Sequence, residues 1–313
     1  MGKAAGLPSF VSLNEGGALT IAAMDPSSRT VLANGLRHHV LEWDGGGRTT
    51  VLCLHGFLDL SWAFHRVAPA LAAAGYHVVA PDLRGHGETE RVGKGGYYHF
   101  MDYLLDVYDL VGALARDRLA LVGHSMGGGI GLYFAGALPD RVWRAVIMEG
   151  GRIPETPLEA VPHRVVEWIQ GVQRVRSHPA RVYATLDDAA AQIRRYDLLC
   201  PESEARFLAE HGTRPVPGGF AFLHDPLHVT RSPHPFRLDV ATAFWRAIRC
   251  PILLLEGAET ELRRTPDWKS RVAAIRDLRQ VAIDGAGHMM MRHQPEQVAT
   301  LIGEFLREDV SAT

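Results

Sequence analysis

The sequence predicts an α/β architecture: a doubly wound, mostly parallel sheet of eight strands with a helical cap inserted into it. Two observations predict this fold. Short runs that are nearly all apolar alternate with helical patterns along most of the 313 residues, which is typical of parallel strands covered by helices on both faces. The alternation stops between Arg152 and Trp245, and the strand signal returns at Pro251, which indicates an insertion after one strand.

The positions of the individual elements follow from the same patterns. The strand-like runs are Thr30–Leu32, His39–Trp43, Thr50–Leu54, His77–Ala80, Leu119–Val122, Ala145–Met148, Ile252–Leu255 and Arg279–Ile283. The helical patterns between them are Ala63–Ala74, Met101–Ala115, Ile130–Leu138, Trp268–Ile275 and Glu296–Leu306. Within the insertion, amphipathic patterns cover Val165–Val175 and Ala189–Leu199. Because the sheet resumes after these helices, a cap over the carboxyl edge of the sheet is favoured over the alternative, a second independent domain.

The chain is therefore expected to have three parts. Residues 1–28 contain Gly, Pro and Ser without a clear period and are predicted to be an N-terminal extension. Residues 29–151 and 246–313 are predicted to form the core, and residues 152–245 the cap.

Bulk properties exclude several classes of function. The formal net charge of −2 gives no electrostatic reason to expect a nucleic acid or an anionic membrane as partner. No apolar stretch is long enough to span a bilayer, and the N-terminus lacks the pattern of a secretory signal. The cysteines Cys53, Cys200 and Cys250 have no paired spacing, which favours a reduced, cytoplasmic setting over a disulfide framework. The oligomeric state is left open.

The most informative motif is Gly123-His124-Ser125-Met126-Gly127, a G-x-S-x-G pattern between an apolar run and a glycine-rich apolar segment. A strand, a sharp turn and a helix are expected there, which is the context of a nucleophile elbow. The turn strains the serine backbone, and glycines are needed because side chains at their positions would clash across the turn. Ser125 is therefore the predicted nucleophile, and the side chain of His124 is expected to point away from the Ser125 face.

Two further segments supply what a serine nucleophile needs. Acyl transfer places negative charge on a carbonyl oxygen, and backbone N–H groups stabilise that charge. The turn His55-Gly56-Phe57, after an early strand, predicts an oxyanion hole formed by the amides of Phe57 and Met126. A serine hydroxyl also needs an adjacent base. His288 follows the last strand, in the chain order serine, acid, histidine, and is the predicted base.

The acid that would orient His288 is left open among three glutamates. The segment after the penultimate strand, Glu256 to Leu262, contains no aspartate. Glu261 is the first choice in that segment, and Glu259 is the third. Glu149 is the second, because it follows the strand just before the cap, from which an acid can also reach the histidine.

Taken together, the motifs resemble the α/β-hydrolase fold superfamily from about residue 30 onward, as a serine carboxylesterase-like member with a cap. The matching segments are His55-Gly56-Phe57, Asp82-Leu83-Arg84-Gly85-His86-Gly87, Gly123-His124-Ser125-Met126-Gly127-Gly128 and Gly285-Ala286-Gly287-His288. The resemblance implies Ser125 as nucleophile, His288 as base, and Phe57 with Met126 as oxyanion hole. The second segment is the D-L-R-G-H-G turn, in which Arg84 and His86 are expected to be structural.

The resemblance also bears on the acid and on the type of chemistry. Many relatives place the acid in a G-x-x-S-D-x-L segment, and the similar segment Gly257 to Leu262 puts Glu261 at that position, with Glu in place of Asp. Haloalkane-dehalogenase-like relatives take an acid from the strand before the cap, an arrangement that Glu149 resembles, but their nucleophile is aspartate. Because this chain has Ser125, dehalogenation and epoxide opening through an aspartyl ester are not expected.

The expected function is hydrolysis of a carboxylic ester through an acyl-enzyme, with a small-molecule ester as partner and without a metal or an organic cofactor. Aromatic residues of the cap are expected either to line the substrate pocket or to pack the cap on the core: Trp168, Phe207, Phe220 and Phe222. Two alternatives stay open. One is lactone or carbon–carbon bond hydrolysis, or cofactor-free perhydrolysis, by the same triad. The other is a catalytically silent protein that binds a ligand in the pocket.

Overall fold

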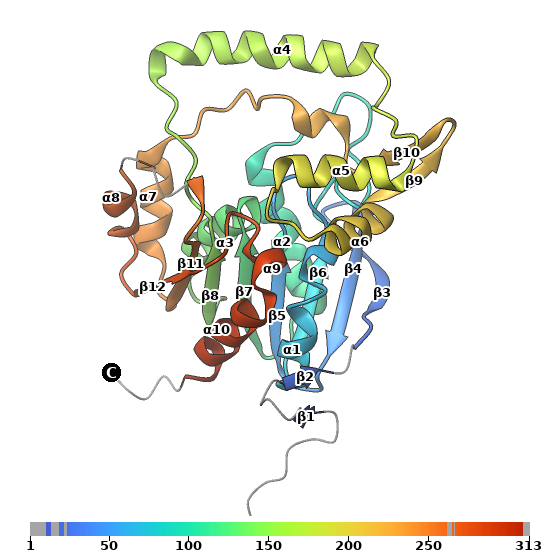
Figure 1. The fold of residues 1–313 in the computed structure, drawn as a ribbon. Coiled ribbons are helices and arrows are strands. Elements are labelled where there is room, and N and C mark those ends of the chain that lie inside the picture. Colours follow the sequence, from blue (N-terminus) through green and yellow to red (C-terminus); the bar gives the residue numbers. More distant parts are fainter. Residues whose placement is uncertain (1–10, 14–18, 22–23, 262–264, 266, 309–313) are drawn as a thin grey trace, which may run out of the picture.

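The sheet of the computed structural model has the strand order β12-β11-β8-β7-β5-β6-β4-β3 (Figure 1). The structure describes residues 11–13, 19–21, 24–261, 265 and 267–308. β4 is antiparallel to both of its neighbours, β3 and β6, and the other pairs are parallel. The strands are β3 (Ser27–Ala33), β4 (Leu36–Asp44), β5 (Thr49–Leu54), β6 (His77–Pro81), β7 (Arg118–His124), β8 (Arg144–Met148), β11 (Ile252–Gly257) and β12 (Leu278–Ile283). The prediction of a mostly parallel, eight-stranded sheet is confirmed.

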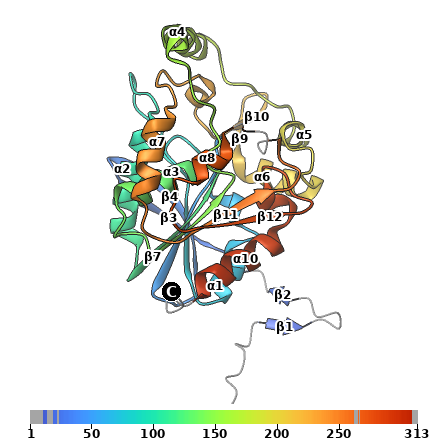
Figure 2. The ribbon, with the colours of Figure 1, turned by 90° about the vertical axis from the view of Figure 1, so that its left-hand side faces the viewer.

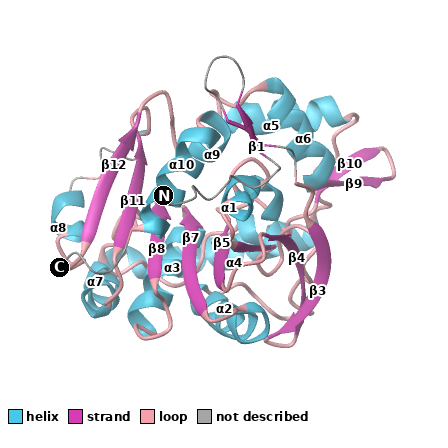
Figure 3. Ribbon diagram, turned by 90° about the horizontal axis from the view of Figure 1, so that it is seen from below, coloured by secondary structure: helices cyan, strands magenta, loops and turns pink. Residues whose placement is uncertain are grey.

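Helices cover both faces of this sheet (Figure 2 and Figure 3). One face packs against α2 (Phe100–Leu114), α3 (Met126–Ala137), α7 (Leu238–Ala247) and α8 (Trp268–Val272). The other face packs against α1 (Ala68–Ala73), α9 (Met290–His293) and α10 (Pro295–Arg307). In β7, Leu119 and Leu121 join the first apolar core, whereas Ala120 and Val122 join the second. Because both faces are buried, the central strands are apolar at nearly every position.

The helices differ from their predicted bounds at one or both ends, and two of these differences have a clear local cause. The pattern Ala63–Ala74 is divided into a 3₁₀ helix, η1 (Ser61–Phe64), and α1, with Pro69 in the first turn of α1. Proline lacks an N–H and clashes inside a helix, so it fits a first turn and not an interior. α3 begins at Met126 rather than at Ile130. Its first turns contain glycines, which have low helix propensity and therefore hide the start of the helix in the sequence.

The insertion, residues 152–237, lies over the carboxyl ends of the parallel strands (Figure 1). Its elements are η2 (Leu158–Ala160), α4 (Val161–Ser177), α5 (Leu186–Tyr196), α6 (Glu202–Gly212), β9 (Thr213–Val216), β10 (Gly219–Phe222) and η3 (Pro226–Val229). α4 is furthest from the sheet, while α5 and α6 lie closer to it. α5, α6 and the segments beside them share a small apolar cluster that includes Tyr183, Ala190 and Cys200.

The predicted boundary between cap and core, after residue 245, falls inside α7. Ala241 and Trp245 of α7 are buried in the apolar core beside α3. Phe244 of α7 stacks on Tyr133 of α3, with the ring centroids 4.6 Å apart. An amphipathic pattern shows that one face of a helix is buried but not which neighbour buries it. α7 packs as a core helix, and the insertion ends before it.

The chain before the sheet contains a separate antiparallel pair, β1 (Val11–Leu13) and β2 (Leu19–Ile21). The predicted N-terminal extension, residues 1–28, includes this pair and the first two residues of β3, while residues 1–10, 14–18 and 22–23 lie outside the described residues. Of the helices in the described part of the chain, none combines the length and the apolar character needed to cross a membrane.

The contact between α3 and α7 predicts opposite effects for two glycine substitutions. A Cβ on Gly136 of α3 would lie 2.2 Å from the carbonyl oxygen of Phe244, so Gly136→Ala must push two backbones apart. We expect this variant to lower the free energy of unfolding by about 1–3 kcal/mol. The control, Gly112→Ala, is on an exposed position of α2 where a Cβ meets nothing within 4 Å, and should raise it by about 0.5–1 kcal/mol. Urea unfolding measures both, and a Gly136→Ala protein as stable as the native one would contradict the packing.

Candidate active site

Ser125 lies in the turn between β7 and α3, where its backbone has φ 51° and ψ −110°. A residue other than glycine in this conformation is strained, by roughly 1–3 kcal/mol. Two backbone hydrogen bonds hold the turn: the N–H of Ser125 donates to the carbonyl of Met148 at 2.8 Å, and the N–H of Gly129 donates to the carbonyl of Ser125 at 3.0 Å. The expected strand, sharp turn and helix are all present around Ser125.

The glycines on either side of Ser125 are sterically required. A Cβ on Gly123 would lie 2.4 Å from the carbonyl oxygen of Gly127. A Cβ on Gly127 would lie 2.1 Å from the carbonyl oxygen of Leu54, at the end of the neighbouring strand β5. Both clashes are with backbone, which cannot rotate away as a side chain can, so any larger residue would open the turn.

Ser125 and His288 are in contact, with 3.0 Å between Ser125 Oγ and His288 Nε2. The two residues are 163 positions apart and meet because β7 and the loop after β12 end at the same edge of the sheet. Gly285 gives this loop a left-handed residue, with φ 67°. The side chain of His288 is 34% exposed, so a substrate or a water molecule can reach it.

Glu149 faces the other ring nitrogen of His288, with 3.9 Å between Glu149 Oε2 and His288 Nδ1. This separation is that of a close ion pair rather than a hydrogen bond. The carboxylate is held in place because Oε1 accepts from the N–H of Gly257 at 2.8 Å and Oε2 accepts from the hydroxyl of Thr260 at 3.3 Å. With the ring proton on Nδ1, facing the carboxylate, Nε2 of His288 can accept the proton of Ser125.

The register of the sheet explains why Glu149 lies at this place. Met148, the last residue of β8, pairs with His124, the last residue of β7, so the residues that follow these strands emerge side by side. Glu261, the first choice for the acid, is exposed and directly precedes residues 262–264, which lie outside the described part of the chain. Among the described carboxylates, Glu149 is the one within 4.0 Å of a His288 nitrogen. The geometry therefore favours the second choice, and the role of either glutamate stays a prediction.

Phe57 and Met126, the residues predicted to form an oxyanion hole, follow neighbouring strands. Leu54 at the end of β5 pairs with Gly123 of β7, which brings the turn containing Phe57 beside Ser125. Met126 is the first residue of α3, where a backbone N–H has no acceptor within the helix. Within the described residues, neither the Phe57 N–H nor the Met126 N–H has a hydrogen-bond acceptor. Both amides can therefore donate to a substrate oxygen.

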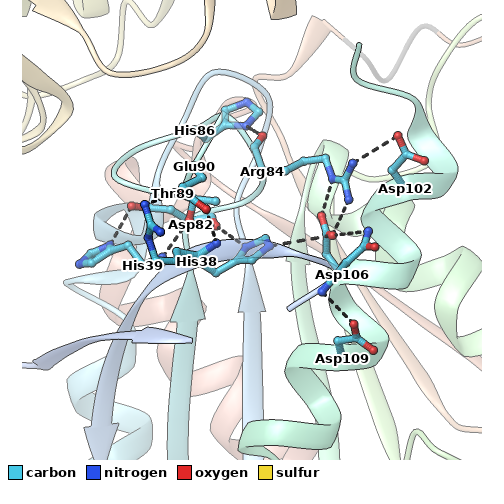
Figure 4. Close-up of polar contacts among 12 residues, drawn as sticks. His38, His39, Asp82, Arg84, His86, Thr89, Glu90, Asp102, Asp106 and Asp109 are labelled. Carbon is cyan, nitrogen blue, oxygen red and sulfur yellow. Dashed lines mark hydrogen bonds and ion pairs between the residues drawn. The ribbon is translucent and has the colours of Figure 1, made fainter. Parts of the chain in front are cut away.

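Polar contacts of Asp82 and Arg84 anchor the D-L-R-G-H-G turn (Figure 4). Asp82 is 2.8 Å from Nδ1 of His39. Arg84 makes two hydrogen bonds of 2.5 Å to the carboxylate of Asp106, which is fully buried, and a further ion pair with Asp102 at 3.3 Å. These contacts tie the turn to β4 and α2, in agreement with the structural role expected of Arg84.

His86 of the same turn contacts the loop that contains Phe57. The N–H of Leu58 donates to Nε2 of His86 at 3.3 Å, and Nδ1–H of His86 donates to the carbonyl of Arg84 at 3.1 Å. Burial, followed by the charge of His228, holds the pKa of His86 well below its usual range, so the ring is neutral and Nε2 can accept. Leu58 has φ 59°, so His86 supports a strained residue directly after Phe57. The sequence did not predict this contact.

His124, the residue before the candidate nucleophile, supports the loop of His288. Its Nε2–H donates to the carbonyl oxygen of His288 at 2.8 Å. Burial, followed by the charge of His288, holds the pKa of His124 well below its usual range, so the ring is neutral. A Cβ on Gly56 would lie 2.8 Å from Nδ1 of His124, which explains the glycine there. The side chain of His124 therefore holds the main chain of His288 in place, a contact that the sequence did not suggest.

A cavity of about 460 Å³ lies between the insertion and the core. Its lining includes Phe57 and also Met289, which follows His288, so the cavity adjoins the candidate site. Of the four aromatic residues singled out in the sequence, Phe222 lines this cavity. Phe207 instead stacks on His65, with the ring centroids 4.1 Å apart, and packs the insertion on the core.

Matched substitutions distinguish the two candidate acids. Glu149→Gln keeps the shape of the side chain and an acceptor for the Gly257 N–H, but it removes the negative charge that faces His288. We expect kcat for ester hydrolysis to fall by roughly 10²–10⁴-fold. The control, Glu261→Gln, is expected to change kcat by less than about 3-fold, because an exposed charge contributes little. Steady-state turnover of p-nitrophenyl acetate measures both variants, and the opposite order of effects would assign the acid to Glu261.

Comparisons with known proteins agree with this fold. A family model described as "alpha/beta hydrolase fold" matches residues 49–291. The Serine hydrolase-like protein of Danio rerio is 27% identical over 96% of this chain and 94% of the relative. Epoxide hydrolase A of Mycobacterium tuberculosis is 27% identical over 90% of this chain and 97% of the relative. The crystal structure of a hypothetical protein from Pseudomonas aeruginosa PAO1 has a TM-score of 0.82 at 26% identity, over 91% of this chain and all of that one. The chain belongs to the α/β-hydrolase fold family.

Proposed function

We propose that this protein hydrolyses carboxylic esters through an acyl-enzyme formed on Ser125. The observation that carries the proposal is the 3.0 Å contact between Ser125 Oγ and His288 Nε2. A serine hydroxyl is a weak nucleophile near neutral pH, and a histidine within hydrogen-bond reach activates it by accepting its proton. The strained turn of Ser125 and the buried carboxylate of Glu149 beyond the histidine support the same proposal.

In the proposed reaction, His288 Nε2 takes the hydroxyl proton as Ser125 Oγ bonds to the carbonyl carbon of the ester. The amides of Phe57 and Met126 bind the oxygen that becomes negative, and one such donor is worth typically about 2.7–4 kcal/mol. His288 then gives the proton to the oxygen of the leaving alcohol. In the second half, His288 takes a proton from water, whose oxygen attacks the acyl carbon. The bond between that carbon and Ser125 Oγ then breaks, and His288 returns the proton to Ser125 Oγ as the acid leaves.

Glu149 has a defined part in this scheme. When His288 accepts a proton it becomes a cation 3.9 Å from the Glu149 carboxylate, which is 2% exposed. The attraction between two such charges is stronger in a buried site than in water. Glu149 therefore stabilises the imidazolium and orients the ring without itself taking the proton.

The cavity supports an uncharged, largely apolar acyl group as the preferred substrate, and we infer that the insertion acts as a cap over it. Asp59 and Asp197, which line the cavity, are both paired with Arg292, at 2.8 Å and 3.4 Å. Arg181, a further charged residue of the lining, is exposed and donates to the side chain of Gln192 at 3.4 Å. Much of the remaining wall is apolar, as at Leu60 and Leu208. A volume of about 460 Å³ is that of a small-molecule site.

The candidate nucleophile supports a serine-dependent reaction more than epoxide opening, although relatives of both names occur. The Danio rerio relative is named for serine hydrolases, and the Mycobacterium tuberculosis relative for epoxide hydrolysis. Epoxide opening through a covalent ester on this fold is expected to use an aspartate nucleophile, and the corresponding position here is Ser125. Ester cleavage is therefore the proposed activity.

The nucleophile is tested by Ser125→Ala. Because the hydroxyl is the attacking group, we expect this variant to lose p-nitrophenyl butyrate hydrolysis by roughly 10³-fold or more. A fluorophosphonate probe should label the native protein and the control Ser177→Ala, an exposed serine of α4, but not Ser125→Ala. Native protein that neither labels nor turns over esters would favour the silent ligand-binding alternative. Unchanged turnover in a folded Ser125→Ala protein would exclude Ser125 as the nucleophile.

The charge preference of the cavity is tested with two esters of equal chain length. p-Nitrophenyl pentanoate is uncharged, whereas the p-nitrophenyl monoester of glutaric acid ends in a carboxylate. We expect kcat/KM to be at least about 10-fold higher for the pentanoate, because burying an unpaired carboxylate beside apolar side chains is unfavourable. Steady-state kinetics on both esters checks this, and a preference for the charged ester would contradict the assignment of the cavity.

A further inference from the structure

We propose that Asp197, a residue of the insertion, is a positioning residue for both loops of the candidate site. The inference rests on the proposed function and deepens it. Asp197 lies between α5 and α6, is 7% exposed and lines the cavity. Its carboxylate contacts two neighbouring residues of α9, Arg292 and His293, and each of them leads to a different part of the site.

The contact with His293 leads to the candidate base. The N–H of Gly287 donates to Nδ1 of His293 at 3.0 Å. Since Nδ1 accepts, the proton of the neutral ring is on Nε2, which donates to Oδ1 of Asp197 at 2.7 Å. A carboxylate partner fixes the tautomer and the orientation of a histidine ring in this way. Gly287 directly precedes His288, so Asp197 fixes the main chain from which His288 projects.

The contact with Arg292 leads to the candidate oxyanion hole. Arg292 is 5% exposed and pairs with Asp197 at 3.4 Å and with Asp59 at 2.8 Å. Asp59 lies two residues after Phe57, and its N–H donates to the carbonyl of Gly56 at 3.3 Å. The contacts from Asp197 through Arg292 to Asp59 therefore hold the turn that contains Phe57. The amide of Phe57 is one of the two proposed donors of the oxyanion hole.

Packing beside Asp197 reinforces the same link. Leu199 lies in the same short segment between α5 and α6, and its Cδ1 would be 3.4 Å from a Cβ on Gly287. The insertion thus approaches the loop of His288 directly through Leu199, and indirectly from Asp197 through His293. A small displacement of a catalytic group lowers the rate steeply, because the reacting atoms must meet in a narrow range of geometry. Docking of the insertion therefore sets the rate of the chemical step as well as the shape of the cavity.

Three variants test this role. Asp197→Ala removes the carboxylate, and His293→Leu removes both ring nitrogens. We expect each to lower kcat for p-nitrophenyl butyrate by about 10–100-fold and to change KM by less than about 3-fold. His293→Gln offers an amide oxygen to the Gly287 N–H and an amide N–H to Asp197, so it should recover most of the kcat that His293→Leu loses.

The control is Glu210→Gln. Glu210 is an exposed carboxylate of α6 that pairs with Arg206 of the same helix at 2.9 Å, and among the described residues it makes no hydrogen bond or ion pair to either loop of the site. We expect its kcat to stay within about 2-fold of the native value. Rates are referred to the folded fraction, measured by circular dichroism, so that a loss of stability is not counted as a loss of rate. If Asp197→Ala does not fold, the comparison of His293→Leu with His293→Gln still tests the proposal.

The outcomes separate this proposal from the proposed function. A rise in KM with unchanged kcat in Asp197→Ala would mean that Asp197 only lines the cavity. Equal rates for His293→Leu and His293→Gln would mean that the hydrogen bonds of the His293 ring do not position the site. Either result overturns the proposal. If the native protein hydrolyses no ester, the proposed function fails, and the crystal structure of His293→Leu decides the positioning role. We expect the distance between Ser125 Oγ and His288 Nε2 to exceed about 3.5 Å in that structure, and an unchanged distance would overturn the role.

Discussion

The whole candidate site depends on the backbone of Ser125, which is held at φ 51° where β7 meets α3. The turn exists only because Gly123 and Gly127 leave room for the backbone that crosses beside them. The buried central strands and the packing of α3 on the sheet offset the free-energy cost of this strained conformation. They determine the turn more strongly than the backbone preference of serine does. The position of Ser125 is thus fixed by the packing around it. The predicted base, the carboxylate of Glu149 and the two predicted oxyanion-hole amides each follow the end of a different strand.

The core fold was predictable because a sheet buried on both faces leaves continuous apolar runs in the sequence. The beginnings and ends of some helices were not. Gly127 and Gly128 disfavour a helix by intrinsic propensity, yet they begin α3 because only glycine fits against the neighbouring backbone. Trp245 was predicted to lie in the cap because the strand signal returns only after it, at Pro251, and the residues of α7 do not show locally that they pack on the core. Local sequence thus predicts burial better than it predicts what covers the buried face.

The same distinction applies to the candidate site. Ser125, His288, Phe57 and Met126 could be singled out because each directly follows or adjoins a strand end that a motif marks. For the acid, motif spacing favoured Glu261, whereas the register between β7 and β8 places Glu149 beside the histidine. Register is a property of the assembled sheet and leaves no local pattern. Asp197 and Arg292 carried no signal at all, because they are 95 positions apart and meet only when the insertion lies on the core.

The buried position of Asp197 also limits how freely the insertion can be exchanged between relatives. An insertion from another protein, placed on this core, would leave Arg292 with one carboxylate and the Nε2–H of His293 without an acceptor, unless it supplied an acidic side chain at the same point. An unsatisfied buried donor of this kind costs about 1–3 kcal/mol. The insertion is therefore not an interchangeable module. Under the proposed function, a change of substrate specificity in the insertion must therefore keep the contacts of Asp197 with Arg292 and His293.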